Sequence, residues 1–190
     1  MGYEPRKYAV TPYRPEWAEK FTREAALVKQ ALGGDALYVE HVGGTAVPGL
    51  SSRPVVDLLV TVKNPAGIDR YAFSLKAIGY EPLPDRFMGS MRSFAKDITY
   101  PHGVVERHAT LHVFPEEHTS LLSMIDTREY LLAHPEEVKH LDELKRRAFA
   151  KHQDDCAGYR RDRDEYLEAL AKRAAKWRGR HEEEDIGAVL

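Results

Sequence analysis

The 190-residue sequence has a single cysteine, Cys156, and no apolar run near the roughly 18 residues that a membrane-spanning helix needs. One cysteine excludes an internal disulfide and a cysteine-based zinc site, and it suits a reducing compartment. The N-terminus also lacks the apolar core of a signal peptide. We therefore expect a cytoplasmic protein with no membrane partner.

The sequence has no large excess of positive or negative charge, because it contains 28 lysines and arginines and 30 aspartates and glutamates. This balance gives no overall attraction to polyanions, so nucleic acid is not indicated as a partner. The hydrophobic content of 43% is enough for a folded chain with a substantial core. We predict a single domain over residues 1–190.

Two strand-like runs, at residues 36–42 and 55–62, flank a pair of glycines. The second run is almost continuously apolar, as expected of a strand that is covered on both faces. Gly43 and Gly44 can adopt positive φ and let a ligand approach the main chain, and Thr45 adds a hydroxyl group. This pattern predicts a phosphate-binding turn between two strands.

Asp57 interrupts the second apolar run. An isolated buried charge is very costly, so this carboxylate must face a solvated cleft, pair with a cation or bind a metal. Arg53 is close enough in the chain to form that pair or to neutralise a phosphate. We favour the phosphate for Arg53, and we take Asp57 as a catalytic and metal-binding candidate.

Two glycines, a hydroxyl residue and an aspartate on the next strand resemble the signature of polymerase-β-type nucleotidyltransferases. The segment HVGGTAVPGLSSRPVVDLLV resembles the GrpB-like family more closely still. Further matches to that family extend over roughly residues 12–170. The resemblance implies an α+β fold with a nucleotidyltransferase-like mixed β-sheet core and flanking helices at 14–118. It also implies a C-terminal helical extension at 119–178 that packs on this core.

The same resemblance implies a function. It points to a protein that binds a nucleoside triphosphate with a divalent metal, Mg²⁺ or Mn²⁺, and transfers a nucleotidyl group to an acceptor that the sequence does not identify. Active nucleotidyltransferases carry a second carboxylate two residues after the first, where this chain has Leu59. The family also commonly has serine in place of Gly44 and histidine in place of Thr110. The alternative is a catalytically impaired nucleotide- or phosphate-binding regulatory module.

His41 and His112 lie on predicted strands that could meet Asp57 in one cleft. An aspartate with two imidazoles would form a mixed oxygen and nitrogen metal site, which favours Mn²⁺, Zn²⁺ or Ni²⁺ over Mg²⁺. His112 can equally act as a general base, and either histidine can be a half-buried packing residue. Arg92 is a further phosphate-binding candidate, because a planar guanidinium group suits phosphate oxygens.

Outside the central stretch, the hydrophobic spacing predicts mostly helices. The expected elements are a helix at 15–32, a helix at 65–78, a hairpin at 80–95, a loop at 97–107, a strand at 107–114 and helices from about 120 onward. Breaks are expected at Asp126-Thr127 and at His134-Pro135, and the acidic tail after Arg178 is expected to fray.

Two basic clusters, at 145–147 and 160–163, alternate with acidic residues. Their spacing is typical of solvated helix faces with pairs of opposite charge one turn apart. A homodimer that forms through these C-terminal helices is a further hypothesis.

Overall fold

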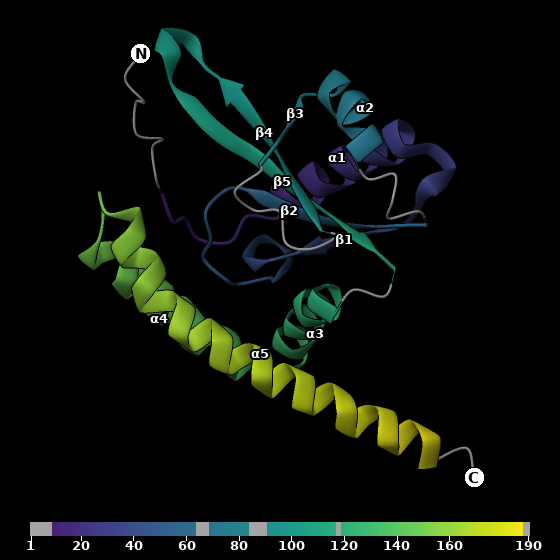
Figure 1. Cartoon of the computed structure of the whole chain (residues 1–190). Helices are drawn as coiled ribbons and strands as arrows, with labels where there is room; N and C mark the ends of the chain where they lie inside the picture. The colour runs from purple at the N-terminus through teal and green to yellow at the C-terminus, as the bar shows by residue number, and fades with distance from the viewer. Residues whose placement is uncertain (1–8, 64–68, 84–90, 117–118, 188–190) are drawn as a thin grey trace.

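The computed structural model of the chain describes residues 9–63, 69–83, 91–116 and 119–187, and it contains a five-stranded sheet with helices on both sides (Figure 1). The strands are β1 (Ala36–Val42), β2 (Val56–Val62), β3 (Tyr80–Pro82), β4 (Arg92–Thr99) and β5 (Val105–Pro115). The strand order is β1-β2-β5-β4-β3. Only the β2–β5 pairing is parallel among these strands, so the sheet is mixed and the predicted α+β class is confirmed.

The helices divide into two groups along the chain. They are α1 (Glu16–Leu32), α2 (Tyr71–Ala77), α3 (Thr119–Ala133), α4 (Pro135–Lys151) and α5 (Cys156–Gly187). In the described residues, the short 3-10 turns η1 (Gly33–Asp35), η2 (Gly44–Ala46) and η5 (Pro101–Gly103) connect elements of the sheet half. Among the described helices, none has both the length and the apolar composition needed to cross a bilayer.

The two faces of the sheet are covered by different helices. α1 and α2 pack on the face that carries Leu58 and Val60, whereas α3 packs on the face that carries Leu59 and Phe114. Because side chains alternate along a strand, Asp57 lies on the same face as Leu59. The sequence run that looks uniformly apolar is therefore divided between two separate packing layers.

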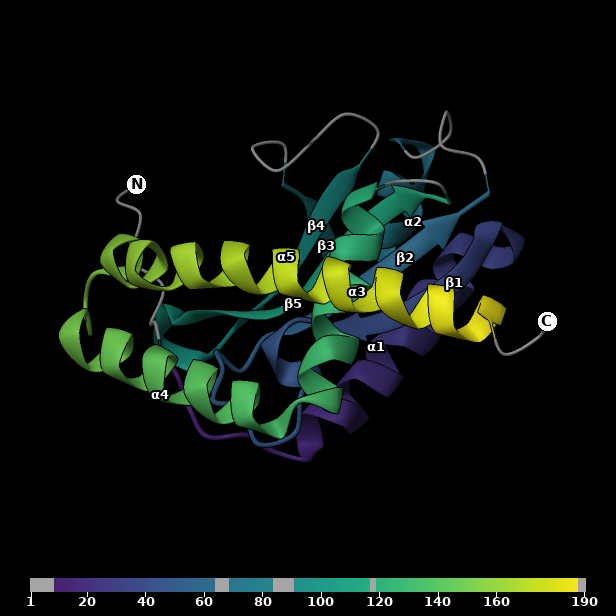
Figure 2. The same cartoon turned by 90° about the horizontal axis from the view of Figure 1, so that it is seen from below.

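The C-terminal helices pack on the loop that follows η2 as well as on one another (Figure 2). Val47 and Leu50 of this loop are each 1% exposed and lie in a cluster with apolar residues of α3, α4 and α5. The predicted break at His134-Pro135 is present, since α4 begins at Pro135. Asp155 caps α5, because its Oδ1 accepts a hydrogen bond from Gly158 N at 2.9 Å.

Some predicted element bounds are wrong. α3 runs without a break through Asp126 and Thr127, because the Thr127 hydroxyl donates to Ser123 O at 2.7 Å and Asp126 pairs with Arg178 at 2.9 Å. These partners satisfy both polar side chains inside a continuous helix. α5 likewise continues through Arg178 to its end, where fraying was expected.

The predicted loop at 97–107 is also largely replaced by strand. β4 and β5 approach each other closely and are joined through η5, because long antiparallel pairing satisfies the main-chain groups of these residues. The predicted helix at 65–78 and hairpin at 80–95 are present as α2 and as the β3–β4 pairing. Parts of both predictions, at 64–68 and 84–90, lie outside the described residues.

A buried carboxylate joins α1 to the sheet. Glu24 accepts hydrogen bonds from Lys96 Nζ at 2.9 and 3.1 Å and from the Tyr80 hydroxyl at 3.0 Å, and His108 Nε2 lies 3.2 Å from it. Burial alone would raise the pKa of Glu24, but hydrogen bonds from His108, Lys96 and Tyr80 lower it to about 2. The ionised form of Glu24 therefore stabilises the fold.

Replacing Glu24 with glutamine should lower the free energy of unfolding at pH 7 by about 2 kcal/mol, because the amide keeps the shape but loses the charge that its donors stabilise. The folded-state pKa is depressed, so this contribution is complete above the ordinary value of 4.5 and is lost as the pH falls toward 2. Denaturant unfolding of both proteins from pH 7 to pH 2.5 should show their stabilities converging in acid.

Glu19→Gln is the matched control for this measurement, because Glu19 lies on the same helix with 73% of its side chain exposed. Its substitution should change the free energy of unfolding little at any pH. A difference between wild type and Glu24→Gln that stays constant down to pH 2.5 would show that the charge of Glu24 is not what stabilises the fold.

Candidate functional site

The glycine turn between β1 and β2 lies against polar side chains from both halves of the chain. Gly43 has a φ of 76°, and a β-carbon there would lie 2.6 Å from Asp57 Oδ2. At Gly44 a β-carbon would collide with Ser52 Oγ and would lie 2.8 Å from Lys145 Nζ. Glycine is therefore favoured at Gly43 by its positive φ, and any side chain at Gly44 must displace Ser52 Oγ and Lys145 Nζ.

A polar cleft of about 70 Å³ opens beside this turn. Its charged lining residues are Arg53, Asp57, Lys145 and Arg163, and its hydroxyl-bearing lining residues are Thr45, Ser52 and Tyr159. Three basic residues and one carboxylate line the cleft, and Arg163 is also paired with Asp164, so the cleft keeps a smaller excess of positive charge that attracts an anion. Its volume is roughly twice the share of one water molecule in the liquid, which suits a phosphate-sized group.

Lys145 is the most buried cation of the cleft, with 6% of the residue exposed. Its Nζ lies 2.7 Å from Ser52 Oγ. Burial lowers the pKa of Lys145 to about 7, and the charges of Arg163 and Arg53 add to this effect while nearby carboxylates oppose it. Lys145 thus occurs in charged and neutral forms near neutral pH, and the prediction that its cluster is a solvated helix face is wrong at this position.

Ser52 is held from two sides. Two main-chain hydrogen bonds, Thr11 N to Ser52 O at 3.0 Å and Ser52 N to Thr11 O at 2.9 Å, tie it to the N-terminal segment. On the other side, Asp142 Oδ1 of α4 accepts a hydrogen bond from Ser51 N at 2.6 Å. Ser52 is 4% exposed, so its hydroxyl has a fixed place in the wall of the cleft.

His41 lies on the opposite face of the sheet from Asp57. It pairs with Leu58, whose side chain belongs to the core under α1, and its ring stacks on Phe21 of α1 with centroids 4.6 Å apart. The alternation of side chains along β1 and β2 causes this separation. The predicted metal-ligand role of His41 beside Asp57 is therefore not supported.

His41 instead positions Thr45. Its Nε2 lies 3.0 Å from Thr45 Oγ1, and this hydroxyl donates to Val55 O at 3.3 Å. Because the hydroxyl proton is directed at Val55, Nε2 of His41 carries a proton and donates to Thr45. Burial, with a smaller contribution from the charge of Arg128, lowers the pKa of His41 to about 4, which is consistent with a neutral ring.

His112 lies on the same face of the sheet as Asp57, as predicted, but it is not the residue of β5 that lies beside Asp57. Asp57 pairs with Thr110 and Leu59 pairs with His112, so the histidine is two residues, or roughly 7 Å, along β5. Its Nδ1 lies 3.0 Å from Ser93 Oγ. Within the described part of the chain, no group of three His, Cys, Asp or Glu residues could hold a metal, so the predicted three-ligand site does not form.

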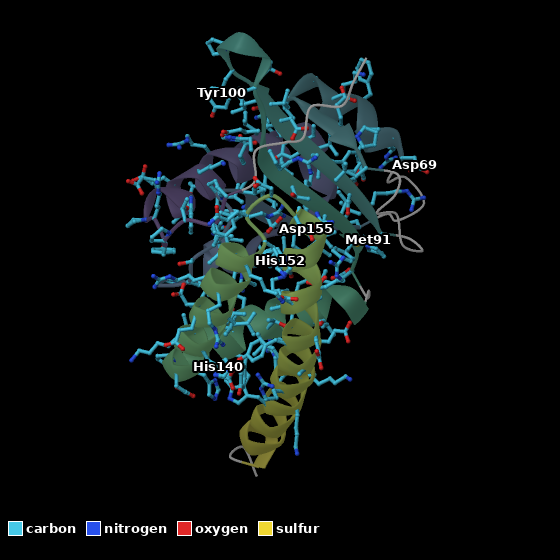
Figure 3. The ribbon with its side chains drawn as sticks, turned by 90° about the vertical axis from the view of Figure 1, so that its left-hand side faces the viewer. Asp69, Met91, Tyr100, His140, His152 and Asp155 are labelled. Atoms are coloured by element: carbon cyan, nitrogen blue, oxygen red, sulfur yellow. The ribbon has the colours of Figure 1, made fainter. Side chains whose placement is uncertain are left out.

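Arg92 does not reach the cleft. It pairs with Val113, whose side chain is in the core under α1 and α2, which places Arg92 on the opposite face from Asp57. Its Nε donates to Asp69 Oδ1 at 2.9 Å and its Nη1 to Met91 O at 3.1 Å; Figure 3 labels both partners. Arg92 therefore cannot bind the same phosphate as the glycine turn, and that prediction is wrong.

The structure thus brings together most of the predicted phosphate-binding residues. Those at the turn and cleft are Gly43, Gly44, Thr45, Arg53 and Asp57. The sequence interpretation missed the contributions of Ser52, Lys145, Tyr159 and Arg163. A signal for Lys145 was present, because it continues the helical stripe of buried residues in α4, namely Val138, Leu141 and Ala148.

Comparison with known proteins finds similarity over most of the chain. The family model described as GrpB protein matches residues 7–173. UPF0157 protein YqkA of Bacillus subtilis (strain 168) is 27% identical over 93% of this chain and 50% of its own length, so this chain spans half of that relative. The crystal structure of conserved protein GrpB from Enterococcus faecalis is 30% identical, with a TM-score of 0.80 over 88% of this chain and 98% of that one.

Replacing Gly44 with alanine should lower the free energy of unfolding by about 1–3 kcal/mol, because the new methyl group must displace Ser52 and Lys145. Gly34→Ala is the matched control, since a β-carbon there would meet nothing within 4 Å. Denaturant unfolding of the three proteins measures both changes. Equal effects of the two substitutions would show that the glycine turn is not tightly packed.

Replacing Lys145 with methionine should raise the melting temperature at pH 7, because the buried amine of Lys145 is costly in its charged form. Its folded-state pKa of about 7 lies below the ordinary 10.5, so the unfolded chain binds more protons between these values. The stability of the wild type should therefore rise with pH relative to Lys145→Met over this interval. Thermal unfolding of both proteins at pH 7 and pH 10 tests this. If the difference in melting temperature between Lys145→Met and wild type is as large at pH 10 as at pH 7, Lys145 is charged in the fold.

Proposed function

The chain belongs to the GrpB family, and from this premise and the geometry of the cleft we propose that it binds the phosphate groups of a nucleoside triphosphate beside the glycine turn. The proposal includes transfer of a nucleotidyl group to an acceptor whose identity is open. One observation carries it: cationic side chains from three separate segments, Arg53, Lys145 and Arg163, line one small cleft. Like charges gather in this way where an anion is to be held.

The two guanidinium groups are suited to phosphate oxygens. Arg163 donates from Nε and Nη2 to Asp164 Oδ1 at 3.0 and 2.6 Å, and its guanidinium lies 5.4 Å from the centre of the Tyr159 ring. These contacts fix the plane of the group at the cleft wall. In the described part of the chain, Arg53 forms no ion pair with Asp57, so the pairing considered as the alternative for this arginine is absent.

The cleft has room for a phosphate group, so the rest of the nucleotide must lie outside it. The first N–H groups of η2 have no partner within the turn, and they add main-chain donors beside the cationic side chains. Asp57 is the one carboxylate of the cleft lining, where it can accept a hydrogen bond from an attacking hydroxyl group. Mg²⁺ can bind through one carboxylate together with substrate phosphates, so Asp57 remains the candidate ligand for a divalent metal in this proposal, and the protein's own cations neutralise further phosphate charge.

A second candidate function is binding without transfer. Leu59 stands where active nucleotidyltransferases have their second carboxylate, and it is completely buried in an apolar cluster with Phe114 and Leu121. This position cannot contribute to metal binding, which favours a nucleotide-binding regulatory module. Pyrophosphate release from each of the four nucleoside triphosphates, with and without Mg²⁺ or Mn²⁺, separates the two functions because only transfer produces it.

Replacing either Arg53 or Arg163 with glutamine should weaken nucleoside triphosphate binding about tenfold or more, because each charge-assisted contact to phosphate contributes at least 1.4 kcal/mol. Isothermal titration calorimetry in a metal-chelating buffer and in Mg²⁺ measures the affinities. Arg161→Gln is the control, since this neighbour on α5 is 71% exposed and pairs with Asp155. Wild-type affinity in both cleft variants would rule out phosphate binding at this cleft.

A further inference from the structure

The contact between Ser52 and Lys145 is more than phosphate binding requires. Ser52 Oγ and Lys145 Nζ lie 2.7 Å apart, and this is the one hydrogen bond of the Ser52 side chain in the described part of the chain. Both residues are buried, and both line the cleft. A hydroxyl group next to an amine at an anion-binding cleft is the arrangement of a nucleophile and its base.

We propose that Ser52 is a nucleophile that Lys145 activates, and that Ser52 Oγ takes the nucleotidyl group from the bound nucleoside triphosphate to form a covalent nucleotidyl-serine. This inference rests on the proposed function, because the nucleotide must first bind at the cleft. It deepens that function by giving the transfer a covalent intermediate on the protein.

The step balances in atoms and charge. The bond between Ser52 Oγ and the α-phosphorus forms, and the bond from that phosphorus to the bridging oxygen of the β-phosphate breaks. The hydroxyl proton of Ser52 passes to neutral Lys145 Nζ. Pyrophosphate leaves with the bonding electron pair, and Arg53 and Arg163 stabilise its charge. An acceptor hydroxyl or water then displaces Ser52 from phosphorus. Lys145 returns its proton to the Ser52 oxygen, and the neutral amine that results takes the proton of the acceptor and passes it to solvent.

The surroundings of Lys145 favour the neutral amine that this step needs. Arg163 faces it from α5 and Arg53 from the segment before β2, while Asp142 of its own helix and Asp57 of β2 provide the opposing negative charges. Burial and the two guanidinium groups outweigh the carboxylates, and the pKa of Lys145 falls to about 7. The base is therefore available at neutral pH.

The main chain around Ser52 is arranged for attack. Gly44 places no side chain between the turn and the Ser52–Lys145 pair, which leaves the hydroxyl next to the main chain that would hold the phosphate. The hydrogen bonds to Thr11, and from Ser51 to Asp142, fix the position of the hydroxyl without using it. Such restraint lowers the entropic cost of reaching the reactive geometry.

The test uses the full-length protein and ATP labelled with ³²P at the α-phosphorus in one sample and at the γ-phosphorus in another. After quenching in denaturant, wild type should retain the α-label, and peptide mass mapping should place the nucleotidyl group on Ser52. Ser52→Ala should lose the label while nucleotide binding remains measurable by calorimetry, because Arg53 and Arg163 are retained. Ser51→Ala is the matched control and should keep both, because the side chain of this neighbour makes no hydrogen bond in the described residues.

The role of Lys145 needs a readout that a structural hydrogen bond would not change. In wild type the initial rate of labelling should rise about tenfold for each pH unit below the pKa of Lys145 and level off above it, because only the neutral amine accepts the proton. Lys145→Arg keeps a cation that does not deprotonate, so it should bind nucleotide but label at less than a hundredth of the wild-type rate. Circular dichroism checks that each variant is folded, and Ser52→Cys provides a second nucleophile of similar size that should restore labelling.

The outcomes separate this inference from the function on which it rests. Nucleotide binding without retained α-label, label that survives in Ser52→Ala, or retention of the γ-label alone would overturn the covalent intermediate and leave the binding function intact. A labelling rate independent of pH would overturn the role of Lys145 as the base. Absence of nucleotide binding in wild type would overturn both proposals.

Discussion

The structure depends on the packing of one helix, α4, against the loop that follows the glycine turn. Asp142 and Lys145 of α4 contact Ser51 and Ser52 by hydrogen bonds of 2.6 and 2.7 Å, and Leu50 is buried beside them among the C-terminal helices. Burying a lysine amine is costly unless hydrogen bonds or a change of protonation compensate for it. This interface, together with the packing of α3 on the sheet, joins the two halves of the chain, and it sets the chemistry of the cleft between them.

The alternation of side chains along the strands decides which polar residues can act together. Asp57 and His112 share one face of the sheet, while His41 and Arg92 are turned toward the helices on the other face. Each residue on the far face has its own partners there, such as Phe21 for His41. The cleft is consequently built from a loop, one strand and two helices, and not from a row of strand residues.

The sequence motif of this GrpB-family chain matches the nucleotidyltransferase pattern at some positions and departs from it at others. The glycine turn and Asp57 follow the nucleotidyltransferase pattern, but the apolar Leu59 replaces an acidic residue in a packed cluster. Cationic side chains from the C-terminal helices supply charge where a pair of metal-binding carboxylates is missing. The helical half of the chain is thus part of the candidate site and not only a support for the sheet.

The α+β class, most helices and strands, and the group formed by the glycine turn, Arg53 and Asp57 could be predicted from the amino-acid sequence. These follow from local patterns, because hydrophobic period and turn residues act over a few positions. The fold places Lys145 and Arg163 in this group and excludes His41 from it, which the sequence did not predict. The reason is that strand register and helix docking bring together residues about 100 positions apart, as between Ser52 and Lys145, and local patterns carry no information on such distances.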